Sequence, residues 1–315
     1  MNIRLAPALS GQIARFDGLA CYVGGMGPPL LLVHSVNAAA SSAEMRTLYE
    51  HYRHDHSVFA LDLPGFGLSE RKDCDYTPRL MTDALHRTVA LMRRSCGSQP
   101  VDAVALSLGC EFLARAACEA PAHFARLAFI SPTGLDGQKS LRGAAGSTRE
   151  VPGLHALLSQ PLWAKALYGQ LTRPAVVRYF LEKTFGSKQI DETAWAYAVA
   201  TARQPGAHHA PLHFLARKLF SADIHRVYDT LPQPVWMGCG VRGDFADFRG
   251  LARVPGAARW SRSMFNTGAM PHLEVPQAFC RALDSYLDDD YNREPPSARK
   301  PSAPVRGSWV PLDAK

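Results

Sequence analysis

The sequence predicts an α/β fold, in which a doubly wound, mostly parallel sheet of about eight strands carries an inserted helical cap. Short apolar runs alternate with helical segments through residues 1–133, which we assign to the first part of the core. Residues 134–231 lose this alternation and become helical and aromatic, which predicts the cap. The alternation returns in residues 232–288, the second part of the core.

The expected core strands are continuous apolar runs, because a parallel strand covered by helices on both sides is buried on both faces. These runs span residues 28–33, 57–61, 101–106, 127–130, 234–237 and 260–265. The helices expected between and after them span residues 43–52, 78–96, 110–119 and 276–287. In such a sheet, catalytic groups are expected at the carboxyl ends of the strands.

Composition excludes several classes of function. The chain is 47% hydrophobic and 20% charged, and no apolar run reaches the roughly 18 residues of a membrane span. Its net charge of +7 is spread along the chain without a basic block, so we expect neither a nucleic-acid nor a membrane partner. Residues 289–315 are rich in Pro, Ser, Arg and Lys, which predicts a disordered tail.

Cysteine usage and the N-terminal segment favour a cytoplasmic protein. The first residues lack the uninterrupted apolar core of a secretory signal, and the seven cysteines contain no CxxC pair, which predicts reduced thiols. Two histidine groups, at residues 51–56 and 208–213, lack carboxylate or cysteine partners at zinc-site spacing. We therefore expect no metal and no other cofactor.

The strongest local signal is the segment 105–109, Ala-Leu-Ser-Leu-Gly, between an apolar strand and a helix. A tight strand-to-helix turn with small flanking residues exposes the central side chain at the edge of the sheet. The following helix N-terminus favours developing negative charge. Ser107 is therefore the candidate nucleophile, and the alternative is a buried serine that caps the helix.

Three segments together resemble the α/β-hydrolase fold family, over residues 13–287. They are His-Ser-Val-Asn at 34–37, Asp-Leu-Pro-Gly-Phe-Gly-Leu-Ser at 62–69, and the turn that carries Ser107. The resemblance implies a cap, an acidic loop and a histidine loop in that order, and a serine-nucleophile, esterase-like member.

The resemblance also implies an oxyanion hole next to Ser107. Its donors would be the backbone N–H groups of Leu108, directly after the nucleophile, and of Val36 in the first loop. The same first loop would bring its polar residues to the substrate pocket; these are His34, Ser35 and Asn37.

The segments that should carry the acid and the base of the catalytic triad match the family pattern less closely than the turn at Ser107 does. Asp244 follows the strand after the cap and would orient the base, with Asp247 as the competing carboxylate. In the histidine loop, Ala269 occupies the position at which the family places its base. His272 is the remaining imidazole of that loop and is assigned as the base, with a helix-end packing role as the alternative.

These residues predict acyl transfer on a small apolar or ester substrate. His272 would deprotonate Ser107, which would attack the carbonyl, and water would release the acid. Three alternatives stay open: a non-catalytic binding protein that has lost its base, a carbon–carbon bond hydrolase, and a lyase. The sequence does not determine the oligomeric state.

Overall fold

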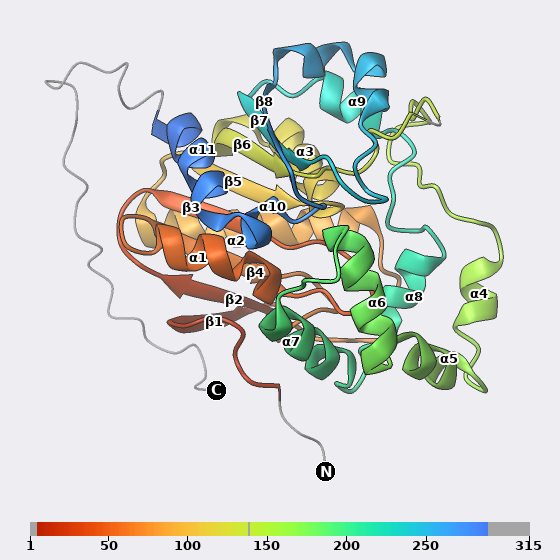
Figure 1. Cartoon of the computed structure of the whole chain (residues 1–315). Helices are drawn as coiled ribbons and strands as arrows, with labels where there is room; N and C mark the ends of the chain where they lie inside the picture. Colours follow the sequence, from red (N-terminus) through yellow and green to blue (C-terminus); the bar gives the residue numbers. More distant parts are fainter. Residues whose placement is uncertain (1–4, 138, 289–315) are drawn as a thin grey trace, which may run out of the picture.

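A computed structural model describes residues 5–137 and 139–288 of the chain. The expected disordered tail, 289–315, lies outside the described residues. Eight strands form one sheet in the order β1-β2-β4-β3-β5-β6-β7-β8 (Figure 1). Strands β3 to β8 pair in parallel, whereas β2 pairs antiparallel with both β1 and β4. The predicted fold class is therefore confirmed.

The bounds of the six strands from β3 to β8 match the predicted apolar runs to within a few residues, and two further strands, β1 and β2, precede them. The strands are β1 (Gln12–Phe16), β2 (Leu19–Gly24), β3 (Pro29–Val33), β4 (Ser57–Asp62), β5 (Val101–Leu106), β6 (Phe124–Ile130), β7 (Val235–Gly240) and β8 (Ser261–Phe265). Strands β3, β4 and β5 are buried along their whole length, as the continuous apolar runs predict.

Helices cover both faces of the sheet. They are α1 (Arg46–Tyr52), α2 (Pro78–Cys96), α3 (Gly109–Glu119), α4 (Leu154–Leu158), α5 (Ala164–Leu171), α6 (Pro174–Phe185), α7 (Glu192–Ala202), α8 (His209–Leu215), α9 (Ile224–Asp229), α10 (Pro271–Glu274) and α11 (Pro276–Asp288). Alternate residues of β3 belong to two separate clusters: Leu31 packs with α2 and α3, and Leu30 packs with α1 and α11. Successive side chains of a strand point to opposite faces of the sheet, so the core has one apolar layer on each face.

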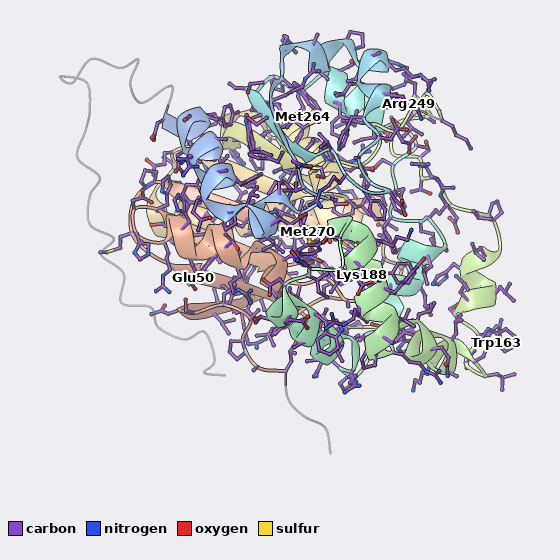
Figure 2. All side chains as sticks on the ribbon, viewed as in Figure 1. Glu50, Trp163, Lys188, Arg249, Met264 and Met270 are labelled. Atoms are coloured by element: carbon purple, nitrogen blue, oxygen red, sulfur yellow. The ribbon has the colours of Figure 1, made fainter. Side chains whose placement is uncertain are left out.

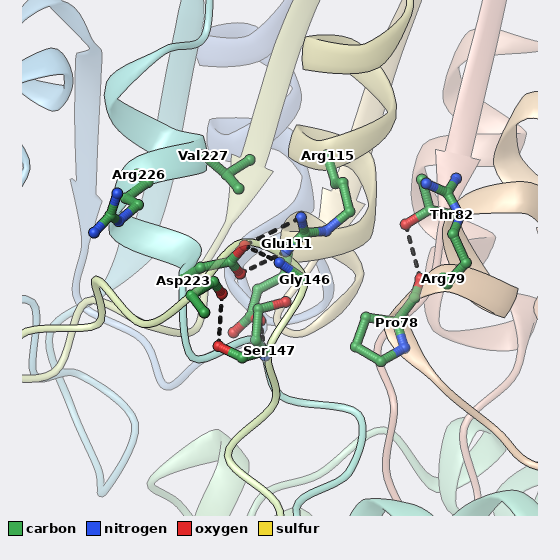
Figure 3. A network of polar contacts seen from close by, with 12 residues as sticks. Pro78, Arg79, Thr82, Glu111, Arg115, Gly146, Ser147, Asp223, Arg226 and Val227 are labelled. Atoms are coloured by element: carbon green, nitrogen blue, oxygen red, sulfur yellow. Dashed lines mark hydrogen bonds and ion pairs between the residues drawn. The ribbon is translucent and has the colours of Figure 1, made fainter.

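Helices α4 to α8, which we call the cap helices, lie between β6 and β7 in the chain and to one side of the sheet (Figure 1). Trp163, at the outer edge of the cap, is 41% exposed (Figure 2). After the cap helices the chain returns to the core through α9, which packs on α3. There Arg115 Nη2 donates to Asp223 Oδ1 at 2.6 Å (Figure 3).

Candidate functional site

Ser107 stands in the turn between β5 and α3, at the carboxyl end of a central strand. Its φ is 53°, in the left-handed region that costs a residue with a side chain about 1–3 kcal/mol. The backbone N–H of Ser107 donates to the Ile130 carbonyl at 2.8 Å, which fixes the turn to β6. This strained, anchored turn is the geometry that the sequence segment 105–109 predicts.

Gly109 allows α3 to begin directly against β3. A Cβ atom at this position would lie 2.5 Å from the backbone carbonyl oxygen of His34. Such an approach is closer than real Cβ contacts, and a backbone oxygen cannot swing aside. The small residue two places after Ser107 therefore sets how closely the first loop approaches the serine.

Ser107 lines a cavity of about 450 Å³ between the carboxyl ends of the strands and residues 134–231, which we call the inserted segment. The first loop contributes Ser35, Val36 and Asn37, and the loop after β8 contributes Ala269 and Met270. Met270 is buried, and Figure 2 shows it near the middle of the view, between the core and the cap. The Ser107 hydroxyl makes no hydrogen bond to any residue that the structure describes, so it is available to a ligand.

Val36 and Leu108 lie on the cavity wall beside Ser107. Within the described residues, neither backbone N–H makes a hydrogen bond. A buried N–H without a partner is costly, and it is commonly retained where a ligand oxygen completes it. The geometry thus leaves these two donors open, although the oxyanion hole itself stays a prediction.

The first loop is held from behind by Glu44. One carboxylate oxygen accepts from the backbone N–H of Ser35 at 2.9 Å, and the other accepts from Asn37 Nδ2 at 2.9 Å. Asn37 Nδ2 also donates to the Ser35 hydroxyl at 3.0 Å. These bonds hold the residues on both sides of Val36, which lines the cavity.

The alpha/beta hydrolase family model matches residues 30–282 of the chain. This chain belongs to the α/β-hydrolase family. A search of curated protein sequences finds no match. No helix within the described residues is both long and apolar enough to cross a membrane. The described residues also contain no group of three His, Cys, Asp or Glu side chains that could hold a metal ion.

Solved structures of the same fold share little sequence with the chain. A bacterial membrane phospholipase A is 20% identical, covers 90% of this chain and 87% of its own, and gives a TM-score of 0.68. A putative lipase from Acinetobacter baumannii is also 20% identical, with 90% and 93% coverage and a TM-score of 0.67. A serine hydrolase involved in carbazole degradation is 16% identical, with 89% and 98% coverage and a TM-score of 0.68. These likenesses show the fold.

His272 does not reach the cavity, so its assignment as the base is wrong. Its Nε2 lies 2.8 Å from the Glu44 carbonyl oxygen, and its Nδ1 has no hydrogen-bond partner. The ring is fully buried and packs 5.8 Å from Phe279. Burial lowers the pKa of His272 to about 4, which keeps the imidazole neutral. Three residues beyond Ala269, the chain has entered α10 and turned this side chain toward the core.

His34 also has a structural role rather than the predicted place in the pocket. The Leu63 N–H donates to His34 Nε2 at 3.0 Å, so Nδ1 carries the proton and donates to the Ser35 carbonyl at 2.5 Å. Burial lowers the pKa of His34 to about 4. The ring connects the ends of β3 and β4, and it does not line the cavity.

None of the 12 histidines of the chain lines the Ser107 cavity, and all of them lie within the described residues. Ala269, where the family places its base, does line it. Its backbone N–H donates to the Thr184 carbonyl at 2.7 Å, which ties the loop to the end of α6. The position expected for the base is therefore present, but its side chain is a methyl group.

The two candidate acids line the cavity but have other partners. Asp244 pairs with Lys183 at 3.2 Å, and its side chain is largely exposed. Asp247 accepts from Arg249 at 2.8 Å. The Arg249 guanidinium holds the pKa of Asp247 well below its usual range. Neither carboxylate contacts a histidine, so the predicted acid–base pair of Asp244 and His272 is absent.

Two arginines of the cavity, Arg149 and Arg217, are not predicted by any sequence motif. They lie 68 positions apart in the inserted segment, outside any recognisable motif. The alternation that locates core strands carries no information there, because the connection after β6 is irregular. A sequence alone does not show whether an arginine has an ion-pair partner, because that partner is a neighbour in space and not in the chain.

Proposed function

We propose that this α/β-hydrolase family member binds a small molecule whose carbonyl or carboxylate group lies against Ser107, without Ser-His-Asp turnover. The single observation that carries the proposal is the cavity wall without histidine, with Ala269 at the position of the base. The serine, the turn and the two open N–H donors remain. The site is thus equipped to hold an oxygen-bearing group but lacks its proton acceptor.

The missing base matters because a serine hydroxyl is a weak nucleophile until a neighbouring group takes its proton. Loss of the serine or histidine of a triad costs about six orders of magnitude in kcat. A carboxylate is a poor substitute here, because Asp247 has a depressed pKa and Asp244 is paired with Lys183. We therefore expect the site at Ser107 to bind its ligand although it does not turn it over.

The size and lining of the cavity support small-molecule binding. Its volume, about 450 Å³, falls within the range of about 300–1,000 Å³ for small-molecule sites. Phe214, Phe220, Phe245 and Phe248 supply apolar wall, while Ser107 and Asn37 supply polar groups. This mixture suits an organic ligand with one polar end better than a bare ion.

The experiment compares p-nitrophenyl butyrate turnover by the wild-type protein and by Ser107→Ala. We expect equal, near-background rates, because removing a serine that is not activated changes nothing. In parallel, Ser107→Trp should abolish ester binding measured by ligand-observed NMR, because the indole fills the cavity. Turnover that disappears in Ser107→Ala would contradict the proposal.

Acyl-serine hydrolysis is the second candidate, and the left-handed φ of 53° at Ser107 favours it. Such strain is retained in structures where function requires it. Because the cavity offers no imidazole, the proton acceptor would have to be part of the substrate. A substrate that carries its own basic group and is cleaved only when Ser107 is present would favour this candidate.

A reducing compartment, the cytoplasm, is part of the same proposal. All seven cysteines are unpaired, and Cys21, Cys110, Cys239 and Cys280 are buried. Unpaired thiols are typical of proteins that stay in a reducing environment.

A further inference from the structure

We propose that the ligand of the Ser107 cavity carries an anionic carboxylate or phosphate group, which Arg149 and Arg217 bind. This inference rests on the proposed binding function, in which the carbonyl of the same ligand lies at Ser107. Both arginines line the same cavity as Ser107. The ligand class is therefore a small molecule with a carbonyl at one end and an anion at the other.

Backbone contacts place the two arginines on one wall. The Arg149 N–H donates to the Phe220 carbonyl at 2.8 Å, next to a bridge between Thr148 and Ser221. Arg217 has a φ of 64°, and its N–H donates to the Phe214 carbonyl at 2.9 Å. Two distant segments of the chain are thus fixed side by side.

The rings of the same wall support the guanidinium of Arg149. Phe214 and Phe220 pack with ring centroids 5.3 Å apart, and Arg149 Cζ lies 5.8 Å from the centre of the Phe220 ring. A guanidinium over an aromatic face keeps its N–H groups available at its edge. Arg149 is half-buried and lines the cavity.

Neither Arg149 nor Arg217 forms an ion pair with a side chain of the described residues. Burial lowers the pKa of Arg149, and the charge of Arg217 lowers it further. The two like charges repel each other, and an anion bound to both guanidinium groups would offset that repulsion. Planar guanidinium groups match the geometry of carboxylate and phosphate oxygens.

Three carboxylates, those of Asp136, Asp244 and Asp247, line the same cavity as the two arginines. Asp244 and Asp247 are neutralised by Lys183 and Arg249, respectively. Asp136 and Glu111 act on Arg149 and raise its pKa. The Glu111 oxygens are already engaged, since they accept from the Thr133 hydroxyl at 2.6 Å and from the Ser221 N–H at 2.8 Å. Arg217 is exposed and forms no ion pair with a side chain of the described residues, so its guanidinium is accessible to a ligand that enters the cavity from solvent.

The test is isothermal titration calorimetry of the full chain with three kinds of ester. These are the monomethyl esters of succinate, glutarate and adipate, the neutral dimethyl esters, and the analogues that carry a phosphonate in place of the free carboxylate. We expect the best anionic ester to bind at least about 10-fold more tightly than its diester, as a charge-assisted hydrogen bond predicts. Whichever anion binds more tightly identifies its chemical class.

Arg149→Gln and Arg217→Gln should each weaken anionic-ester binding by about 10- to 100-fold and weaken diester binding much less, because the diester offers no anion to the guanidinium. Arg203→Gln, which removes an exposed charge at the end of α7, is the matched control and should keep the preference. Equal binding of monoester and diester, or an unchanged preference in Arg149→Gln, would overturn this inference alone. Binding of no ester by the wild-type protein would overturn the proposed function as well.

Discussion

At the scale of single residues, two histidines that a motif search favours turn out to be structural. Both His34 and His272 are fully buried and bond backbone groups. Sequence spacing could place His272 in the correct loop, but it could not show which way α10 turns the side chain. The alanine at position 269 was the more reliable indication of the missing base. Position 269 does line the cavity, and an alanine side chain cannot accept a proton.

The neutral state of these imidazoles predicts how stability depends on pH. Burial lowers the pKa of His272 from 6.5 to about 4, so the unfolded chain binds its proton first as the pH falls. Stability is therefore full above pH 6.5 and is lost toward pH 4. Between pH 7.5 and pH 5, His272 should account for about 2 kcal/mol of lost unfolding free energy. Urea unfolding at the two pH values measures this loss.

His272→Gln should show a smaller loss of stability between these pH values than the wild-type protein does. His54→Gln, which changes an exposed histidine, is the control and should keep the wild-type loss. An identical pH dependence in His272→Gln and the wild type would contradict the buried, neutral state of His272.

At the scale of elements, the sequence predicted the parallel strands and missed the first hairpin. Strands β1 and β2 join through Asp17 and Gly18, whose φ values are 48° and 76°. An Asp-Gly pair between two strands is a strong hairpin signal, so the hairpin was predictable. It was missed because β1 is half exposed and lacks a continuous apolar run. A buried parallel strand is predicted from its continuous apolar run, whereas an edge hairpin is predicted from the residues of its turn.

Packing of α3 on β3 makes a second prediction. Gly109→Ala places a methyl carbon 2.5 Å from the His34 carbonyl oxygen. Because backbone must move, we expect a loss of about 1–3 kcal/mol in unfolding free energy, measured in urea. Gly169→Ala in the exposed helix α5 has open space around it and is the control, with an expected gain of about 0.5–1 kcal/mol. Equal effects would mean that helix propensity, not close approach, governs Gly109.

At the scale of the whole molecule, the inserted segment is joined to the core by a nearly buried ion pair. The Asp223 carboxylate accepts from Arg115 on α3 and, at 2.7 Å, from the backbone N–H of Gly146 (Figure 3). Only 3% of the Asp223 side chain is exposed. No sequence pattern connects residues 115, 146 and 223, because their proximity follows from the tertiary fold.

Removing one partner of this pair should destabilise the molecule strongly. Asp223→Ala leaves Arg115 partly buried without its carboxylate, and we expect a loss of about 3–5 kcal/mol in unfolding free energy. The control is Asp83→Ala, which removes one of the two carboxylate partners of Arg79 on the exposed face of α2, leaves Glu119 in place, and should cost no more than about 0.5 kcal/mol. A similar small loss for both variants would show that the pair does not join the inserted segment to the core.

The proposed binding function depends on the absence of a base beside an otherwise intact serine turn. Reaction with a fluorophosphonate probe reports directly whether a serine is activated, and Ser107→Ala provides the background. We expect the wild-type protein to react no faster than Ser107→Ala at pH 7.5. Ala269→His places an imidazole on the cavity wall and should gain labelling at Ser107, whereas the same change in Ser107→Ala should not. Rapid labelling of Ser107 in the wild-type protein would contradict the account.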